Sequence, residues 1–413
     1  MSEQRVRVGI ISMEFHRNFA EVGGFGKISQ TIGAHFRANP HLGIDVTFLH
    51  AGAAAPWRES VIDENGIRMI LLPEVRGPGW WRWLVGHALL RRERLDLLLS
   101  IDFGPDFQTF CSALPRTPLL VWSRDPWTPE DRDKVLTLRL PGGGDVLPQG
   151  AVQNRHSDLW KVLRASRAFG RRVLLAATDP FIARKVPPTY GLKDPRVTLL
   201  PNFLDFHVGT VVKTEKPRVV FLGRLDPIKR PWLFFDLAAA LPDVEFVCLG
   251  EPALRGEGAW RPESVPPNVR MLGHRDGQAK VDVLTSSWLL VNTAIHEGLA
   301  LSFLEALACE TPVVATVGAG GLVERFGRCI GRWDGDGRPA LPQLVEAVSS
   351  LLANHEERRR LGAMGREWLE NTHSFPRFFD AFLALCLEAG VRLPGTELPA
   401  SATRTARLRA ERG

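Results

Sequence analysis

Two glutamates, Glu297 and Glu305, lie eight positions apart in a stretch suited to ligand binding. The apolar run 288–291 predicts a buried strand, and residues 301–308 have helical spacing. In an open α/β sheet, ligands bind at the carboxyl ends of strands, and a helix start offers backbone N–H groups that suit phosphate. Because carboxylates repel phosphate, we expect the glutamates to bind neutral hydroxyl groups, such as those of a sugar or a ribose.

Glu305 has a second interpretation that involves no ligand. Ser302 and Glu305 have the spacing of a capping box, in which Glu305 satisfies an N–H group at the helix start. On these residues alone, the two interpretations remain open.

A second stretch carries positive charge at a strand end. The predicted strand 219–222 is followed by Gly223 and by two cations, Arg224 and Lys229, in a loop punctuated by proline. Fixed cations at this edge would stabilise a phosphate group that gains negative charge during a reaction. A solvated loop is the alternative interpretation.

These residues resemble the motifs of retaining glycosyltransferases of family four, which have the GT-B fold. The match includes Glu297, Glu305, the run Thr311 to Val314, and Gly223 with its two cations. The resemblance implies that Glu297 lies by the donor sugar and that Glu305 holds the ribose. It implies three catalytic residues, Arg224, Lys229 and Glu297. The donor-binding residues that it implies are Gly24, Gly223, Gly298, Leu299, Ala300, Leu301 and Glu305.

A glycine-rich stretch, residues 23–26, follows the predicted strand 6–11 and precedes a helix expected from about Ile28. A dinucleotide fingerprint would need glycine at Ser29, and a Walker loop would need Ser or Thr at Ile28. The stretch instead resembles the loop that the family places over the donor phosphates and the acceptor. Gly24 is therefore expected at the donor and Phe25 on the acceptor side.

A further strand, predicted over 118–122, is followed by Arg124 and Asp125. Many family members have a His-Asp pair here, with the histidine near the reacting carbon. Because Arg124 takes the place of the histidine, no catalytic histidine is carried over. We expect Arg124 and Asp125 on the acceptor side.

The alternation of predicted strands and helices indicates parallel sheets. With the resemblance, it predicts an α/β GT-B fold of two facing Rossmann-like domains, with a final helix that crosses back to the first. The expected parts are an acceptor-side domain (1–205), a linker (206–217), a nucleotide-sugar domain (218–375), a crossover helix (376–392) and a disordered tail (393–413).

The composition is that of a globular chain of 413 residues with a net charge of +6. Residues 1–200 hold 27 Lys and Arg against 20 Asp and Glu, and the rest hold 25 against 26. This basic first half favours an anionic membrane or acceptor over nucleic acid, for which no module is recognisable, although simple solubility also explains it. Five cysteines without metal-ligand spacing predict reduced core thiols and no metal site.

Three tryptophans and several arginines share a predicted helix over 80–92. Such a helix suits a membrane interface, although an ordinary amphipathic surface helix is the alternative. No signal peptide is recognisable, so we expect a cytoplasmic protein, with peripheral contact at the inner membrane face left open.

We therefore expect a hexosyltransferase-type enzyme without a metal or other cofactor. It would move a sugar from a nucleoside-diphosphate-sugar to a hydroxyl of a glycan, glycolipid or small molecule, retaining the anomeric configuration. Two alternatives remain: a non-catalytic protein that binds sugar nucleotides or a membrane surface, and another GT-B enzyme such as an epimerase or phosphorylase.

Overall fold

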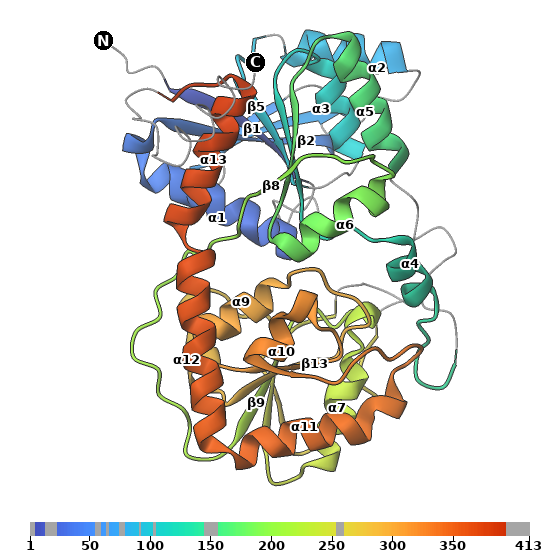
Figure 1. The fold of residues 1–413 in the computed structure, drawn as a ribbon, viewed down its shortest axis with the longest axis vertical. Helices are drawn as coiled ribbons and strands as arrows, with labels where there is room; N and C mark the ends of the chain where they lie inside the picture. The colour runs from blue at the N-terminus through green and yellow to red at the C-terminus, as the bar shows by residue number, and fades with distance from the viewer. Residues whose placement is uncertain are drawn as a thin grey trace. The chain divides into compact units, whose positions relative to one another are not determined.

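The computed structural model describes residues 5–12, 23–53, 59–62, 66–73, 79–90, 92–101, 105–143, 156–252 and 260–393. The chain divides into two compact units, each built around its own sheet (Figure 1). Unit 1 comprises Met1–Arg124, Asn154–Phe203 and Phe375–Gly413. Unit 2 comprises Asp125–Gln153 and Leu204–Ser374.

The described residues of unit 1 form an eight-stranded sheet in the order β3-β4-β2-β1-β5-β6-β7-β8. Every pairing is parallel except that of β3 with β4. The strands are β1 (Val6–Ile11), β2 (Ile44–Ala53), β3 (Glu59–Ile62), β4 (Arg68–Pro73), β5 (Leu97–Ser100), β6 (Leu119–Ser123), β7 (Val173–Ala177) and β8 (Val197–Leu199). All of β5 and β6 is buried, as expected for central strands covered on both faces.

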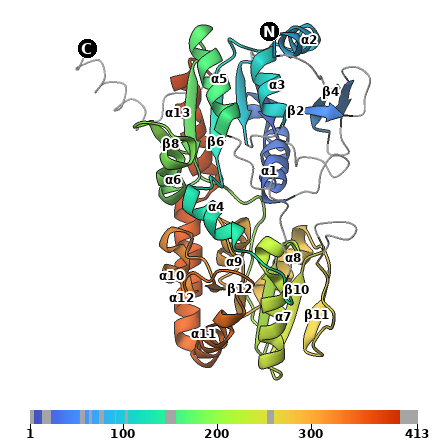
Figure 2. The same cartoon turned by 90° about the vertical axis from the view of Figure 1, so that its right-hand side faces the viewer.

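Helices cover both faces of this sheet (Figures 1 and 2). They are α1 (Gly24–Ala38), α2 (Gly79–Leu90), α3 (Pro105–Ala113), α5 (His156–Ala168), α6 (Pro180–Tyr190) and α13 (Phe375–Ala389), with a 3-10 turn η1 at Pro40–Leu42. Buried aromatic side chains join α13 to the sheet and to α1: Phe378 lies 5.9 Å from Trp122 and Phe382 lies 6.1 Å from Phe36 between ring centroids. Large buried rings of this kind contribute strongly to the free energy of folding. The helix expected over 376–392 is therefore α13, and it belongs to unit 1.

The described residues of unit 2 form a parallel six-stranded sheet in the order β11-β10-β9-β12-β13-β14. The strands are β9 (Arg218–Leu222), β10 (Glu245–Leu249), β11 (Val269–Met271), β12 (Leu289–Asn292), β13 (Val313–Ala315) and β14 (Gly327–Cys329). From β9 the chain first adds β10 and β11 on one side, and then β12 to β14 on the other. The order reverses between β9 and β12, and ligands bind at such a switch point.

The helices of unit 2 are α4 (Pro129–Leu136), α7 (Pro231–Ala240), α8 (Gly277–Ser286), α9 (Leu301–Ala308), α10 (Leu322–Phe326), α11 (Leu341–Ala353) and α12 (His355–Thr372). Three 3-10 turns, η2 (Pro227–Lys229), η3 (Ala319–Gly321) and η4 (Arg338–Ala340), complete the unit. α7 packs against α11, and α9 packs against α8 and α12.

The two units differ from the predicted domains in two places. The first domain was expected to run to residue 205, but Asp125–Gln153 belongs to unit 2. The reason is hydrophobic: Val135 and Leu138 are buried in one cluster with Trp232, Leu233 and Ile295. The expected linker is also part of unit 2, where Lys213 Nζ donates to Cys309 O and Thr311 Oγ1 at 2.9 and 2.8 Å.

Smaller differences concern local structure. The helix expected from about Ile28 begins at Gly24, so the glycine stretch forms its first turn and not a loop. The first N–H groups of a helix have no intrahelical partner, so this turn tolerates glycine better than a helix interior does. Strands β3, β13 and β14 were not predicted.

All five cysteines are free, and burial raises the pKa of the Cys248 thiol to about 12. The expected tail lies outside the described residues, except for Leu393.

Candidate active site

The loop after β9 is held in place by its own side chains. Asp226 accepts a hydrogen bond from Ile228 N at 2.9 Å and so starts the η2 turn that ends at Lys229. Arg230 follows in the left-handed conformation with φ 43° and is fully buried. This turn directs Lys229 toward the neighbouring strand end.

Arg230 ties this loop to the segment that follows β12. Its Nε donates to Thr293 O at 2.8 Å, and its two terminal nitrogens donate to Ala294 O at 3.2 Å and Trp333 O at 2.7 Å. Burial lowers the pKa of Arg230 to about 10, partly opposed by Asp336 and Asp334. The loops after the two switch-point strands therefore form one rigid structure.

Glu297 lies at this junction. Its Oε1 accepts hydrogen bonds from Lys229 Nζ and from Asn292 Nδ2, the latter at 2.9 Å. Asn292 in turn accepts from Ala294 N at 3.0 Å. The structure thus brings together Lys229 and Glu297, two of the three predicted catalytic residues.

Arg224, the third predicted catalytic residue, has the most exposed side chain of the three. Its side chain is 42% exposed, and its guanidinium lies 3.9 Å from the carboxylate of Asp226. An ion pair at this distance and exposure contributes little to stability. The guanidinium can therefore turn to an incoming anion at small cost.

Residues Gly298 to Leu301 lead into α9, whose N-cap is Ala300. Gly298 and Leu299 are buried, and the first turn of α9 carries no acidic side chain. The orphan N–H groups of this turn, together with its partial positive charge, suit a phosphate.

Glu305 does not cap its helix. The N-cap residue is Ala300, no side chain caps the helix start, and Glu305 lies in the second turn. Its Oε1 accepts instead from Lys280 Nζ at 2.6 Å, and Lys280 also lies 3.3 Å from Asp276. Burial lowers the pKa of Lys280, but the two carboxylates outweigh it and the net pKa is raised. The capping-box interpretation is therefore wrong.

His296 directly precedes Glu297 and was not assigned a role from sequence. Its imidazole lies between Asp125 at 2.9 Å and Asp131 at 3.3 Å. Asp125 was expected on the acceptor side of the first domain, but it belongs to unit 2 and contacts His296. Lys280 and Asn292 were also missed, although Asp276 and Lys280 have the i, i+4 spacing of a helical ion pair.

In unit 1, the structure brings together Phe25 and Arg124. The Arg124 guanidinium lies 5.4 Å from the Phe25 ring centroid and 5.0 Å from that of Trp122, within cation–π range. Arg124 is buried. Gly24 is the first residue of α1 in the same unit.

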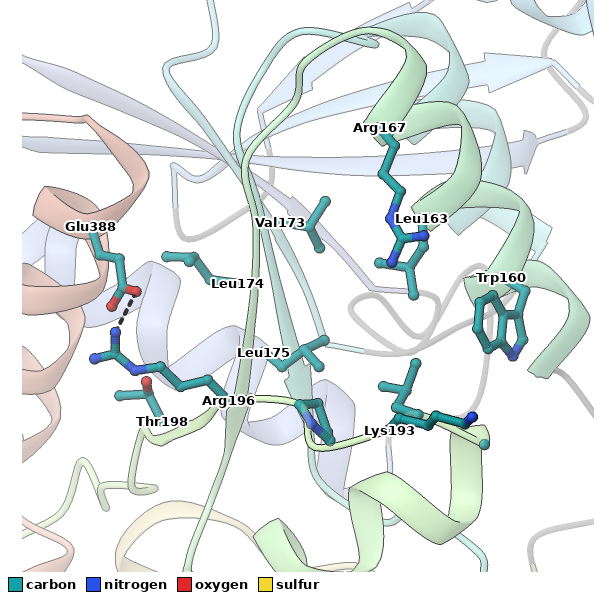
Figure 3. A pocket seen from close by; sticks show the side chains of 13 residues that line it. Trp160, Leu163, Arg167, Val173, Leu174, Leu175, Lys193, Arg196, Thr198 and Glu388 are labelled. Atoms are coloured by element: carbon teal, nitrogen blue, oxygen red, sulfur yellow. Dashed lines mark hydrogen bonds and ion pairs between the residues drawn. The ribbon is translucent and has the colours of Figure 1, made fainter.

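Unit 1 also contains an open hollow of about 560 Å³ (Figure 3). Its lining includes Val173, Leu174 and Leu175, the first three residues of β7, and Lys193, Pro195 and Arg196, which precede β8. These are the amino ends of parallel strands, whereas the predicted ligand edge lies at the carboxyl ends. The hollow is thus separate from the predicted site.

Within the described ranges no group of three acidic, histidine or cysteine side chains is arranged to hold a metal. Within the same ranges no helix is long and apolar enough to span a membrane.

Comparison with known proteins confirms the resemblance. Residues 205–368 match the family model for glycosyl transferases group 1. D-inositol 3-phosphate glycosyltransferase of Mycolicibacterium smegmatis is 30% identical over 162 residues, which cover 34% of this chain and 36% of that protein. The chain thus spans about a third of this curated relative.

Solved structures confirm the GT-B fold. Sucrose-phosphate synthase from Thermosynechococcus elongatus superimposes with a TM-score of 0.68 at 16% identity, over 94% of this chain and 99% of that one. HepE from Anabaena, solved in complex with UDP, gives a TM-score of 0.62 at 14% identity, over 93% and 100% of the two chains. At these identities the similarity establishes the fold, and the activity has to be argued from the site.

Proposed function

We propose that the chain is a glycosyltransferase that moves a sugar from a nucleoside-diphosphate-sugar to an acceptor hydroxyl. One observation carries the proposal: Arg224, Lys229, Glu297 and the start of α9 are gathered around the switch point between β9 and β12. An anion site with a carboxylate beside it is what a sugar joined to a diphosphate requires.

Each part has a role in this scheme. The bond between the anomeric carbon and the diphosphate oxygen breaks, a bond from that carbon to the acceptor oxygen forms, and the proton of the acceptor hydroxyl passes to the leaving diphosphate. Arg224, Lys229 and the first turn of α9 stabilise the charge on the leaving diphosphate without a metal. Glu297 lies beside the sugar, where a carboxylate stabilises positive charge at the anomeric carbon. Glu305 holds the ribose, and the product retains its configuration.

A ligand screen tests the proposal directly. The thermal stability of the protein is measured with UDP-, GDP- and ADP-sugars, beginning with UDP because HepE was solved with it. A ligand at a hundred times its dissociation constant adds about 2.7 kcal/mol to the free energy of unfolding. Retention is read by NMR from the anomeric proton of the product. Stabilisation without release of nucleoside diphosphate would favour the non-catalytic alternative.

We also propose that α2 makes peripheral contact with an anionic membrane. One side of α2 packs on α3, with Gly86 close to Ala113 and His87 Nδ1 3.0 Å from Ala113 O. Another side exposes Trp80 (66%), Trp81 (43%) and Leu84 (45%). Exposed indole rings on a helix, in a half of the chain with a net charge of +7, favour an anionic lipid surface.

Vesicle sedimentation tests this contact. The wild-type protein should sediment with vesicles that contain phosphatidylserine, and less so as the salt concentration rises. The double variant Trp80→Ser/Trp81→Ser should lose most of this binding. Phe169→Ser is the control, because Phe169 is also exposed (48%) but lies at the end of α5. Equal binding by the double variant and the control would contradict the assignment to α2.

A further inference from the structure

His296 has no role in the proposed reaction, yet its imidazole is held on several sides. Nε2 lies 2.9 Å from Asp125 Oδ1, and Nδ1 lies 3.3 Å from Asp131 Oδ1. The Trp127 ring lies 4.9 Å away between centroids, and His296 is only 5% exposed. Each ring nitrogen of His296 therefore has a carboxylate oxygen beside it.

The two carboxylates are themselves fixed. Asp125 Oδ2 accepts from Trp127 Nε1 at 3.0 Å. Asp131 Oδ2 accepts from the backbone N and the hydroxyl of Thr128, both at 2.9 Å, in the capping box that starts α4. α4 is anchored in turn by the burial of Val135. The imidazole therefore occupies a rigid cradle.

This cradle completes a series of contacts that leads to Glu297. Arg230 binds the carbonyls of Thr293 and Ala294, and Ile295 N donates to Ile228 O at 2.9 Å. His296 is the last residue of this series, and Gly298, on the other side of Glu297, has no side chain that could hold the backbone. The orientation of Glu297 therefore depends on its neighbour.

We propose that His296 is a positioning residue for Glu297. Asp125 and Asp131 hold its imidazole, and the imidazole fixes the backbone from which Glu297 extends to Lys229 and Asn292. The effect on turnover rests on the proposed function, whereas the effect on the backbone does not. A purely structural histidine would only fasten residues 125–137 to the rest of unit 2, and the experiments below separate the two roles.

The first experiment is a double-mutant cycle on release of nucleoside diphosphate from the donor. A small misplacement of a catalytic group costs up to about a hundredfold in rate, so His296→Ala should lower kcat about 10- to 100-fold and change KM by less than about threefold. In the Glu297→Gln background, the same change should cost less than about threefold, because residues that act as a unit are not additive. Full additivity would overturn the proposal.

The second experiment asks whether the cradle acts by geometry. In Asp131→Asn, the amide can donate to Nδ1 of a neutral His296, so kcat should stay within about threefold of wild type. Asp131→Ala removes the partner and should behave as His296→Ala. The control is His373→Ala, because His373 is also buried but ends α12. Loss of kcat in the control equal to that in His296→Ala would mean that any buried histidine has this effect.

The third experiment needs no substrate. Hydrogen exchange of residues 296–301 should be at least about tenfold faster in His296→Ala, with segments of unit 2 other than residues 125–137 unchanged. In the His373→Ala control, exchange of residues 296–301 should not change. If His296→Ala does not fold, Asp125→Ala replaces it, with the same expected local effect, because it removes the acceptor of Nε2. Unchanged exchange would overturn the positioning role. Faster exchange in a protein without donor turnover would leave the positioning role intact and remove the proposed function.

Discussion

The two glutamates of unit 2 both pair with a lysine, but the pairs are built differently. Lys229 is 24% exposed and lies in a loop, and its partner Glu297 has a second donor in Asn292. Lys280 is 7% exposed on α8 and lies between Glu305 and Asp276. A partly exposed lysine whose partner has a second donor can turn to a phosphate more easily than a buried lysine, whose movement leaves unpaired charges. The first pair suits a reaction, and the second suits the holding of a fixed geometry.

The largest expected effect is on stability. Lys280→Met leaves Glu305 buried without its cation and should lower the free energy of unfolding by about 3 to 5 kcal/mol. The matched change Lys229→Met should cost less, about 1 to 3 kcal/mol, because Glu297 is also largely buried but keeps Asn292 as a donor. Urea unfolding of both variants measures the contrast. Similar losses in the two variants would remove the distinction between the pairs.

The next effect is on turnover. Arg224→Ala and Lys229→Ala should each lower kcat by about a hundredfold or more, the usual scale for the loss of one preorganised charge partner, with the fold intact. Arg270→Ala is the control, because Arg270 is an exposed arginine on β11 that pairs with Glu245. Steady-state release of nucleoside diphosphate measures all three. Near wild-type turnover in both site variants would exclude these cations from the mechanism.

Nucleotide affinity separates the two glutamates. Glu305→Gln and Glu305→Ala should weaken binding of the bare nucleoside diphosphate by about 1.5 to 3 kcal/mol, the value of a hydrogen bond to a charged group. Glu297→Gln should leave this affinity nearly unchanged and reduce turnover instead. Calorimetric titration of each variant gives the answer. Unchanged affinity in Glu305→Ala would mean that Glu305 only pairs with Lys280.

A smaller effect comes from Lys213, a lysine whose hydrogen-bond acceptors are uncharged. Burial lowers the pKa of Lys213 from 10.5 to about 7, despite the opposing charge of Glu310. Between these values the unfolded chain binds more protons, so the contribution of Lys213 to stability rises with pH. The unfolding free energy of wild type relative to Lys213→Met should therefore increase from pH 7 to pH 10. A difference that is constant with pH would show that Lys213 keeps its ordinary pKa.

The elements that the sequence predicted well are those with long apolar runs. Strands such as 219–222 and 118–122 lie within one residue of β9 and β6, because a buried parallel strand needs a continuous hydrophobic run. β13 and β14 have three residues each, too few for a periodic pattern. The packing of α4 on the rest of unit 2 depends on Val135, which lies in one buried cluster with Trp232, about a hundred positions later, and no local pattern contains this contact.

The site residues could be predicted where a sequence motif contains them. They could not be predicted where the fold brings together residues that are distant in the sequence. Glu297, Lys229 and the start of α9 follow from strand ends and spacing. The partners of the acidic residues do not, since Lys280 lies on α8 and Asp125 reaches His296 from 171 positions away. Such pairs form because separate helices, strands and loops pack together, so they cannot be predicted from the spacing of residues in the sequence.

The central claim is that the switch point of unit 2 binds and cleaves a sugar nucleotide. The measurement that tests it most directly is release of nucleoside diphosphate from UDP-, GDP- and ADP-sugars by wild type and by Glu297→Gln. We predict release from at least one donor by wild type, and a rate at least about a hundredfold lower for Glu297→Gln with nucleotide affinity preserved. No release from any donor, or equal rates for the two proteins, would contradict the account.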